Sequence, residues 1–246
     1  MAATTTTTRW ATAVLVAAAL LTATSASDDK NAVFEPCADA TVQRGDGFTF
    51  GVAFSRRDAF SSGGVQLSPC DSRLNLPSVG AKVALFRPTV DEISLLTVNA
   101  SDPRALENAG GYMVAFAGRK YAARSLPIFV TNNTYTVTGF TLVFEFQKGI
   151  LQNLFWKPDG CSSCSSSGTQ SNSACVEDSC AIKNSICKGT GNGQADCSPG
   201  IQLAFSGTDK HEAVLNSWYE VSKLKQYSLS GLFSNLKDSL ASRFFG

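Results

Sequence analysis

The most reactive side chains in this sequence are those of its cysteines. There are eight of them, an even number. In a secreted chain an even set is typical of a disulfide framework, whereas the Cys161-x-x-Cys164 spacing also suits two ligands of a zinc ion. The sequence contains no second pair at this spacing and only one histidine, His211. We therefore predict disulfide bonds and no metal site. The eight residues are Cys37, Cys70, Cys161, Cys164, Cys175, Cys180, Cys187 and Cys197.

The cysteines fall into two groups that are far apart in the chain. Cys37 and Cys70 lie on either side of the first predicted strand, and the other six lie within residues 161–197. We expect Cys37 to bond to Cys70 and the six others to pair among themselves. The sequence leaves the pairing within 161–197 open.

Candidates for catalysis are few. A Ser-His-Asp or Cys-His centre would have to use His211, and no serine lies in a Gly-x-Ser-x-Gly turn. Glycoside hydrolysis needs only two carboxyl groups, which Asp91-Glu92 or Glu177-Asp178 would offer if they faced one sugar. Adjacency in sequence does not ensure this, so we interpret both pairs as loop charges. We predict an exposed His211, no catalytic residue and no cofactor.

Two further patterns have a functional and a structural interpretation. Arg44-Gly45-Asp46 is the adhesive tripeptide that animal integrins recognise, but Gly45-Asp46-Gly47 is also typical of a turn before a strand, and we favour the turn. Basic residues cluster at Arg56-Arg57 and at Arg119, Lys120 and Arg124. An acidic cell-wall polysaccharide or a phospholipid surface could use them, and solvated loops are the interpretation that we prefer.

The N-terminus has the order of a secretory signal peptide. Arg9 precedes an apolar run over residues 11–21, which is too short to span a bilayer comfortably, and small residues follow at 24–26. We expect cleavage after Ala26, with an uncleaved anchor as the alternative. Removing Arg9 from 21 basic residues leaves 20, which equals the 20 acidic residues, so we expect no nucleic-acid partner. Behind such a signal, Asn99-Ala100-Ser101 and Asn132-Asn133-Thr134 predict glycans on Asn99 and Asn132.

Short alternating segments separated by turn residues predict a mainly β fold, an antiparallel β-sandwich or barrel formed by residues 27–157 and a last strand in 201–209. Residues 158–200, which are rich in serine, glycine and cysteine, predict a disulfide-rich insertion that caps one end of the sheet. No helical period is evident before residue 210. The predicted strands are 48–55, 81–87, 93–98, 112–117, 126–131, 135–147, 150–157 and 201–205.

Helical spacing of apolar residues begins at Val214 and Leu215 and predicts two C-terminal amphipathic helices within 210–246, broken near Gly231. This segment has five basic and three acidic residues, a net charge of +2. Its apolar face can pack against the sheet, which we favour, or lie on a membrane.

The opening of the mature chain, Ala-Val-Phe-Glu-Pro-Cys at 32–37 and Gln-Arg-Gly-Asp-Gly-Phe-Thr-Phe-Gly at 43–51, resembles a plant family of secreted proteins labelled Expp-like. The cysteine-rich insertion and terminal helix extend this resemblance over most of the mature chain. It implies a plant protein of the cell surface or apoplast and carries over no catalytic residue.

Taken together, the sequence predicts a secreted, non-enzymatic extracellular protein that acts as a binding or structural module of the cell surface or cell wall. Cell-wall polysaccharide and the plasma-membrane surface are the candidate partners. The alternatives are a carbohydrate-active enzyme that uses carboxylates only, and a peripheral plasma-membrane protein that acts through its C-terminal helix.

Overall fold

The structure is a computed structural model, which describes most of the chain after the predicted signal peptide. The described residues are 29–100, 102–119, 123–158, 160–161, 164, 172–188, 193 and 195–226. The predicted signal segment 1–26 and residues 227–246 of the predicted C-terminal helices lie outside these ranges.

The first sheet is built around β1 (Phe50–Ser55), which pairs antiparallel with β4 on one side and β6 on the other. Two short strands, β7 and β8, pair with β6. Phe50, Val52 and Phe54 lie in the core, in keeping with the period of two in the sequence. The other strands of this sheet are β4 (Lys82–Phe86), β6 (Tyr112–Ala117), β7 (Ala123–Arg124) and β8 (Ile128–Phe129).

The second sheet is built around β10 and β14. β10 forms an antiparallel hairpin with β11 and pairs in parallel with β14, and β5 and β15 pair antiparallel with the other edge of β14. The strands are β5 (Ser94–Thr97), β10 (Gly139–Gln147), β11 (Ile150–Lys157), β14 (Gly200–Thr208) and β15 (Val214–Leu215).

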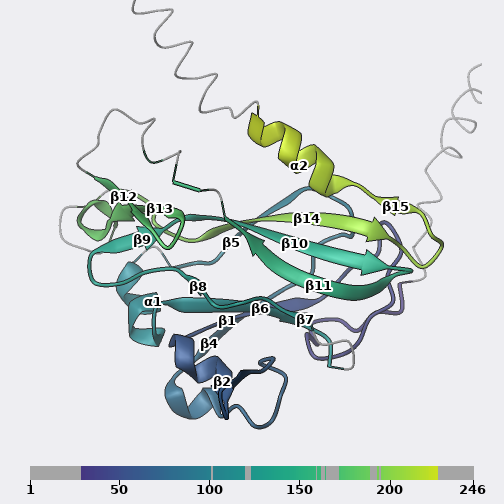
Figure 1. The fold of residues 1–246 in the computed structure, drawn as a ribbon, viewed down its shortest axis with the longest axis horizontal. Helices are drawn as coiled ribbons and strands as arrows, with labels where there is room; N and C mark the ends of the chain where they lie inside the picture. Colours follow the sequence, from purple (N-terminus) through teal and green to yellow (C-terminus); the bar gives the residue numbers. More distant parts are fainter. Residues whose placement is uncertain are drawn as a thin grey trace, which may run out of the picture.

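The two sheets face each other across an aromatic core (Figure 1). The Phe48 and Phe50 rings lie edge-on to Phe144, with 5.3 and 5.0 Å between ring centroids. Phe144 stacks on Phe205 at 5.3 Å. These contacts join β1 and the residues before it to β10 and β14. The predicted mainly β fold is confirmed, and it takes the sandwich form.

The parallel pairing of β10 with β14 departs from the all-antiparallel prediction. β11 ends beside the start of β10, where Lys157 pairs with Thr141, and β14 begins at the same end, where Gly200 pairs with Gly139. The insertion therefore crosses this end of the sheet. It brings the chain to the other side of β10, where β14 runs in the same direction as β10. Parallel strands need such a long connection, which a hairpin cannot supply.

The insertion adds a small third sheet at that end. Its hairpin, β12 (Ser173–Val176) and β13 (Ser179–Lys183), pairs through β13 with β9 (Tyr135–Val137), and the 3-10 turn η4 (Asn184–Ile186) follows. The predicted strand 135–147 is thus two strands that belong to different sheets. Figure 1 shows β9, β12 and β13 together at one end of the sandwich.

A loop-rich segment covers the outer face of β1 and β6 in the first sheet and buries a second apolar cluster against these two strands. The half-buried Cys37 and Cys70 pack against this cluster. The covering elements are η1 (Arg57–Phe60), β2 (Ser61–Ser62), β3 (Val65–Gln66) and η2 (Leu76–Val79). The buried members of the cluster are Ala53, Phe60, Leu67, Leu74, Leu76, Val114 and Phe116.

One helix lies where the sequence shows no helical period. Helix α1 (Pro103–Ala109) begins after Asp102, whose carboxylate accepts the N–H of Arg104, and proline occupies its first turn. The helix ends at Gly110, which has a φ of 120° and lies where a Cβ atom would collide with the backbone of Ser55 and Arg56. Seven residues are too few for an apolar period to be visible, so the capping signals were the only indication.

The start of the predicted C-terminal helices is also wrong. Val214 and Leu215 form strand β15, because the Asp209 carboxylate accepts three backbone N–H groups and turns the chain back along β14. Helix α2 (Ser217–Gln226) follows. Its Trp218 and Val221 pack on the outer face of the second sheet, so the described part of the C-terminal segment covers the sandwich.

Candidate functional site

All eight cysteines are paired, in four disulfide bonds. Cys37 is bonded to Cys70, with 5.5 Å between their Cα atoms, and the other six pair within 161–197. This is the predicted pairing, and it occupies both cysteines of the Cys-x-x-Cys motif. The bonds of the insertion are Cys161–Cys175, Cys164–Cys180 and Cys187–Cys197.

Two of these bonds clamp the insertion hairpin. Cys175 and Cys180 lie opposite each other in the β12–β13 ladder, and they bond to Cys161 and Cys164, which directly follow β11. The hairpin is therefore tied to the chain that leaves the second sheet. The position of its turn relative to the sandwich is fixed covalently, which a segment with so few apolar residues needs.

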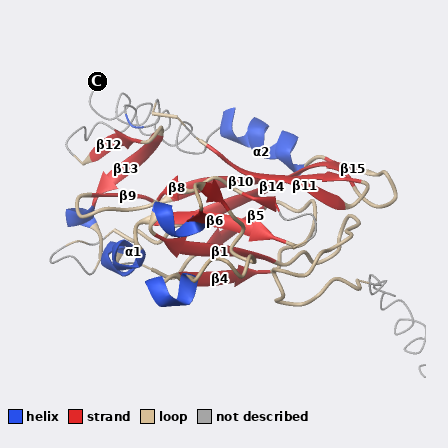
Figure 2. Ribbon diagram, turned by 60° about the horizontal axis from the view of Figure 1, so that its bottom comes forward, coloured by secondary structure: helices blue, strands red, loops and turns tan. Residues whose placement is uncertain are grey.

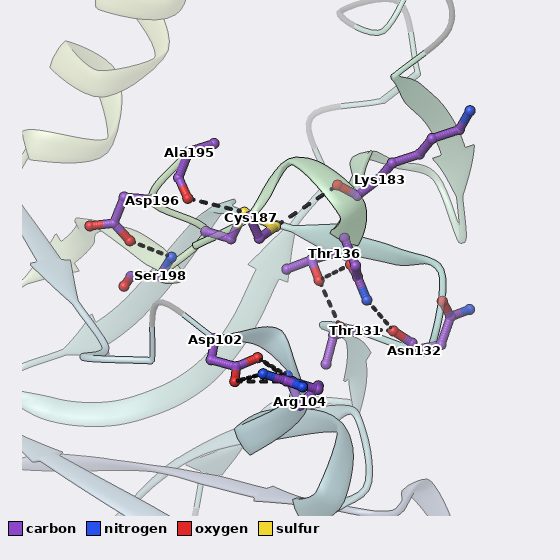
Figure 3. The surroundings of a disulfide bond; sticks show 12 residues. Asp102, Arg104, Thr131, Asn132, Thr136, Lys183, Cys187, Ala195, Asp196 and Ser198 are labelled. Atoms are coloured by element: carbon purple, nitrogen blue, oxygen red, sulfur yellow. Dashed lines mark hydrogen bonds and ion pairs between the residues drawn. A yellow bond between two sulfur atoms is a disulfide. The ribbon is translucent and has the colours of Figure 1, made fainter. Parts of the chain in front are cut away.

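A buried polar cluster attaches the insertion to the turn between β8 and β9. The Asn184 side chain accepts a hydrogen bond from the Thr136 hydroxyl at 2.6 Å and donates to the carbonyl of Asn132 at 2.6 Å. The hydroxyls of Thr131 and Thr136 lie 2.7 Å apart. Figure 3 shows this cluster beside Cys187, whose disulfide partner is Cys197. Buried hydroxyl and amide groups are thus satisfied by residues from two distant parts of the chain.

The turn of the insertion hairpin reaches the first sheet. Glu177 accepts a hydrogen bond from the Tyr112 hydroxyl at 2.9 Å, and the Arg57 guanidinium lies 3.9 Å from the same carboxylate. Arg57 also lies over the Tyr112 ring, 5.5 Å from its centroid. We call the surface formed by Arg57, Tyr112, Glu177, Asp178 and the 132–134 turn the insert end.

Both residues at the tip of this hairpin have left-handed backbone conformations. Glu177 has a φ of 44° and Asp178 a φ of 60°, a pair typical of a two-residue type I′ turn, in which asparagine, aspartate and glycine are preferred. Glutamate in this conformation costs about 1–2 kcal/mol. Such strain persists where the surroundings hold it, and it concentrates at functional sites. Here the hairpin disulfides and the contact with Tyr112 hold it.

The environment of the insert end favours the protonated form of Tyr112. Burial raises the pKa of the Tyr112 phenol, and the adjacent Glu177 carboxylate raises it further, whereas Arg57 opposes this effect. Tyr112 is therefore a hydrogen-bond donor at physiological pH. The Arg57 and Glu177 side chains remain 62% and 40% exposed, so this surface offers cationic, anionic and aromatic groups to a polar ligand.

The two carboxylate pairs lie in different parts of the fold and have different partners. Asp91 is buried, and its oxygens accept the backbone N–H groups of Asn216 and Ser217 and the guanidinium of Arg44. Its neighbour Glu92 is exposed. Asp91 thus fixes the start of α2, a structural role. Glu177 and Asp178 lie at the hairpin tip described above, far along the chain from Asp91.

His211 is exposed, and its Nε2 atom lies 3.2 Å from the amide oxygen of Gln43. The integrin-like tripeptide is a turn, as we favoured. Arg44 is exposed, but Asp46 is 1% exposed and its Oδ2 atom accepts the backbone N–H of Gln43. A buried aspartate is not presented to a receptor.

The two basic clusters lie at opposite ends of β6 and do not form one patch. Arg57 adjoins Tyr112 at the start of this strand, whereas Arg124 pairs with Phe116 near its end. Arg56 lies 3.4 Å from the Asp58 carboxylate, and Arg124 donates to the carbonyl of Gln66. Lys120 lies outside the described residues.

Both predicted glycan acceptors are exposed in loops. Asn99 follows β5, and Asn132 lies in the turn between β8 and β9. The Oδ1 atom of Asn132 accepts the backbone N–H groups of Thr134 and Tyr135, so its side chain is held in a fixed orientation at the insert end. Ser101, the last residue of the first sequon, lies outside the described residues.

A shallow hollow lies between the N-terminal segment and the end of β6. Its enclosed volume is about 10 Å³, far below the roughly 300–1,000 Å³ of ligand pockets. We do not regard it as a small-molecule site. It is lined by Ala38, Asp39, Ala40, Phe48, Ala117, Gly118 and Leu151.

Sequence reasoning named Arg57 and Glu177 in separate patterns but did not bring them together, and it missed Tyr112 and Asn184. Tyr112 and Glu177 are 65 positions apart, and Asn184 is 52 positions from Asn132. No local motif links them, because the register of β13 on β9 brings them together. The one available signal was Glu177-Asp178 between two short apolar runs, which suits a hairpin turn.

The family comparison matches nearly the whole chain. A family model described as "Uncharacterised protein DDB_G0273449" matches residues 9–138 and 127–246. The chain therefore belongs to this family. No curated protein and no solved structure matches.

Two further features hold for the residues that the structure describes. No helix among them is long and apolar enough to cross a membrane. They also contain no group of three or more histidine, cysteine, aspartate or glutamate side chains that would hold a metal ion.

Proposed function

We propose that this chain is a secreted, non-enzymatic extracellular protein that acts as a binding module of the cell surface or cell wall, with the insert end as its contact surface. The observation that carries the proposal is the strained Glu177–Asp178 turn, clamped by two disulfides and pressed against Tyr112 and Arg57. A rigid loop that presents polar groups at one end of a sandwich is a common arrangement for recognition.

The same framework supports the extracellular compartment that we propose. Four disulfides form and persist in oxidising surroundings, such as the secretory pathway and the cell exterior. The resemblance of residues 32–51 to a plant secreted family supports the apoplast as the destination. The predicted glycans on Asn99 and Asn132 suit this route.

We propose a neutral or acidic wall polysaccharide as the ligand class. Arg57 supplies a cation and a planar donor, Tyr112 supplies part of a ring and a hydroxyl, and Glu177 supplies an acceptor. These groups match the hydroxyl and carboxylate groups of sugars. The membrane alternative receives less support, because Trp218 and Val221 of α2 pack against the second sheet.

The test uses the full chain, secreted from plant cells and applied to arrayed wall polysaccharides. Arg57→Ala and Tyr112→Phe should each reduce binding at least tenfold, since they remove groups from the insert end. Arg119→Ala is the matched control, because Arg119 is exposed at the opposite end of β6 and should change nothing. Retention inside the cell would contradict secretion, and equal loss in all three variants would contradict the assignment of the surface.

A further inference from the structure

Strand β4 lies at the margin of the first sheet and has an open backbone edge. Within the described residues, β4 pairs with β1 and no strand pairs with its other side. Figure 2 shows β4 along the lower margin of the sandwich, with no strand beneath it. An edge of this kind is a template on which another strand can add.

The hydrogen-bond pattern identifies the groups that point away from the sheet. Phe48 donates its N–H to the carbonyl of Pro88, and hydrogen-bonded pairs alternate along an antiparallel ladder. Val83 and Leu85 therefore direct their N–H and C=O groups to the open side, where no described residue bonds to them. The residues whose backbone groups bond to β1 by this alternation are Lys82, Ala84 and Phe86.

The side chains beside these open groups are apolar and exposed. Val83 is 53% exposed and Leu85 is 40% exposed, and they lie opposite Ala53 and Gly51 on the outer face of the sheet. Natural edge strands are usually protected by charged residues, proline or a covering element. β4 has one charge, at Lys82, and no proline.

We propose that β4 pairs antiparallel with β4 of a second copy of this chain, about a two-fold axis at Ala84. Val83 then lies opposite the partner's Leu85, and each pair exchanges two hydrogen bonds, so all open groups of both strands are satisfied. The four apolar side chains lie side by side on the outer faces. Lys82 faces the partner's Phe86, so no like charges meet across the interface.

A second copy fits this edge because β4 is self-complementary: the open groups of one strand match those of an identical strand in antiparallel orientation. A five-residue strand is about 17 Å long, and its interface is smaller than the roughly 800 Å² per partner of stable complexes. We therefore expect a reversible dimer rather than a permanent one.

Strand β5 offers a comparable edge on the second sheet. Val98 donates its N–H to the carbonyl of Pro199, so the backbone N–H and C=O groups of Leu95 and Thr97 point away from β14. The Leu95 residue is 73% exposed. The predicted glycan acceptor Asn99 lies two positions beyond the end of β5, however, and a glycan there would crowd that edge. β5 therefore provides the matched control.

The test is sedimentation of the secreted full chain between about 1 and 200 μM, a range chosen around the micromolar dissociation constants of weak complexes. We expect a monomer–dimer equilibrium. Leu85→Lys should raise the dissociation constant at least tenfold. Val83→Pro should do the same, since it removes an N–H that the monomer leaves open and edge strands tolerate proline. Leu95→Lys and Thr97→Pro on β5 should leave the constant unchanged.

A chain that stays monomeric over the whole range overturns the proposal. So does a dimer that the β5 variants dissociate and the β4 variants do not. If either β4 variant fails to fold, hydrogen exchange of the unchanged protein decides. The amides of Val83 and Leu85 should gain protection as the concentration rises, and equal exchange at all concentrations overturns the proposal.

Discussion

Replacing both Cys37 and Cys70 with alanine tests how far crosslinks, rather than burial alone, stabilise this sandwich. The two residues have a sequence separation of 33, so the bond closes a loop of 34 residues when both cysteines are counted. The chain-entropy model gives a loss of about 4 kcal/mol for a loop of this length. For a domain of this size, each kcal/mol lowers the melting temperature by about 2–4 °C, so we expect a fall of roughly 8–16 °C.

The assays are thermal unfolding and guanidinium unfolding of the secreted protein and its variant, both followed by tryptophan fluorescence. The midpoint should fall while the transition remains cooperative, because the apolar cluster under this bond is formed by residues that stay in place. Ser72→Ala is the control, since Ser72 is exposed within the same loop and its replacement should change stability little.

A loss below about 1 kcal/mol would refute the reasoning, because the bond would then not restrict the unfolded chain as the model requires. Loss of all cooperative unfolding would also refute it. The segment between the two cysteines would then depend on the crosslink for its structure and not only for its stability.

Asp91→Ala should lower the free energy of unfolding by about 2–3 kcal/mol, because it leaves two backbone N–H groups without an acceptor. Asp91→Asn should lower it by about 1 kcal/mol. Chemical denaturation measures both losses, and a larger loss for Asp91→Asn than for Asp91→Ala would contradict this prediction. Burial raises the pKa of Asp209, but three backbone N–H groups hold this pKa below its usual value of 3.8. The carboxylate therefore stabilises the fold above that pH, and this contribution is lost as the pH falls below it. Asp209→Asn should flatten the acid limb of a stability–pH profile, and an unchanged limb would contradict this prediction. Treatment with an N-glycosidase should reduce the mass of the secreted protein at Asn99 and Asn132, and unmodified peptides at both would contradict their use.

The fold class was within reach of the sequence because its signals are local. Phe48, Phe50, Phe144 and Phe146 alternate with smaller or polar residues, and the structure places their rings together in the core. Strand β11 (Ile150–Lys157) has the predicted bounds for the same reason.

Other elements depend on contacts that local patterns do not contain. Val214 and Leu215 suit the apolar face of a helix, yet their pairing with β14 is decided by the Asp209 turn. The break between β9 and β10 is likewise imposed by β13, which pairs with β9 alone.

The candidate site was the least predictable part. Cysteine counting indicated the disulfides, because redox chemistry leaves few alternatives for an even set in a secreted chain. Arg57, Tyr112 and Glu177 gave no comparable signal, since their meeting depends on how the insertion folds back on the first sheet. Asp91 and Asp46, which looked available for chemistry or adhesion, are buried and used by neighbouring backbone groups.

The central claim is that this chain is an exported, disulfide-bonded extracellular protein. The most direct test is the intact mass of the deglycosylated protein collected from the fluid outside the producing cells, with and without reduction. We predict a start at Ser27 or within about two residues of it, as signal-peptide cleavage sites allow. We also predict that reduction adds about 8 Da, two hydrogens for each of four bonds. Protein found only inside the cells, with residues 1–26 retained and free thiols, would contradict the claim.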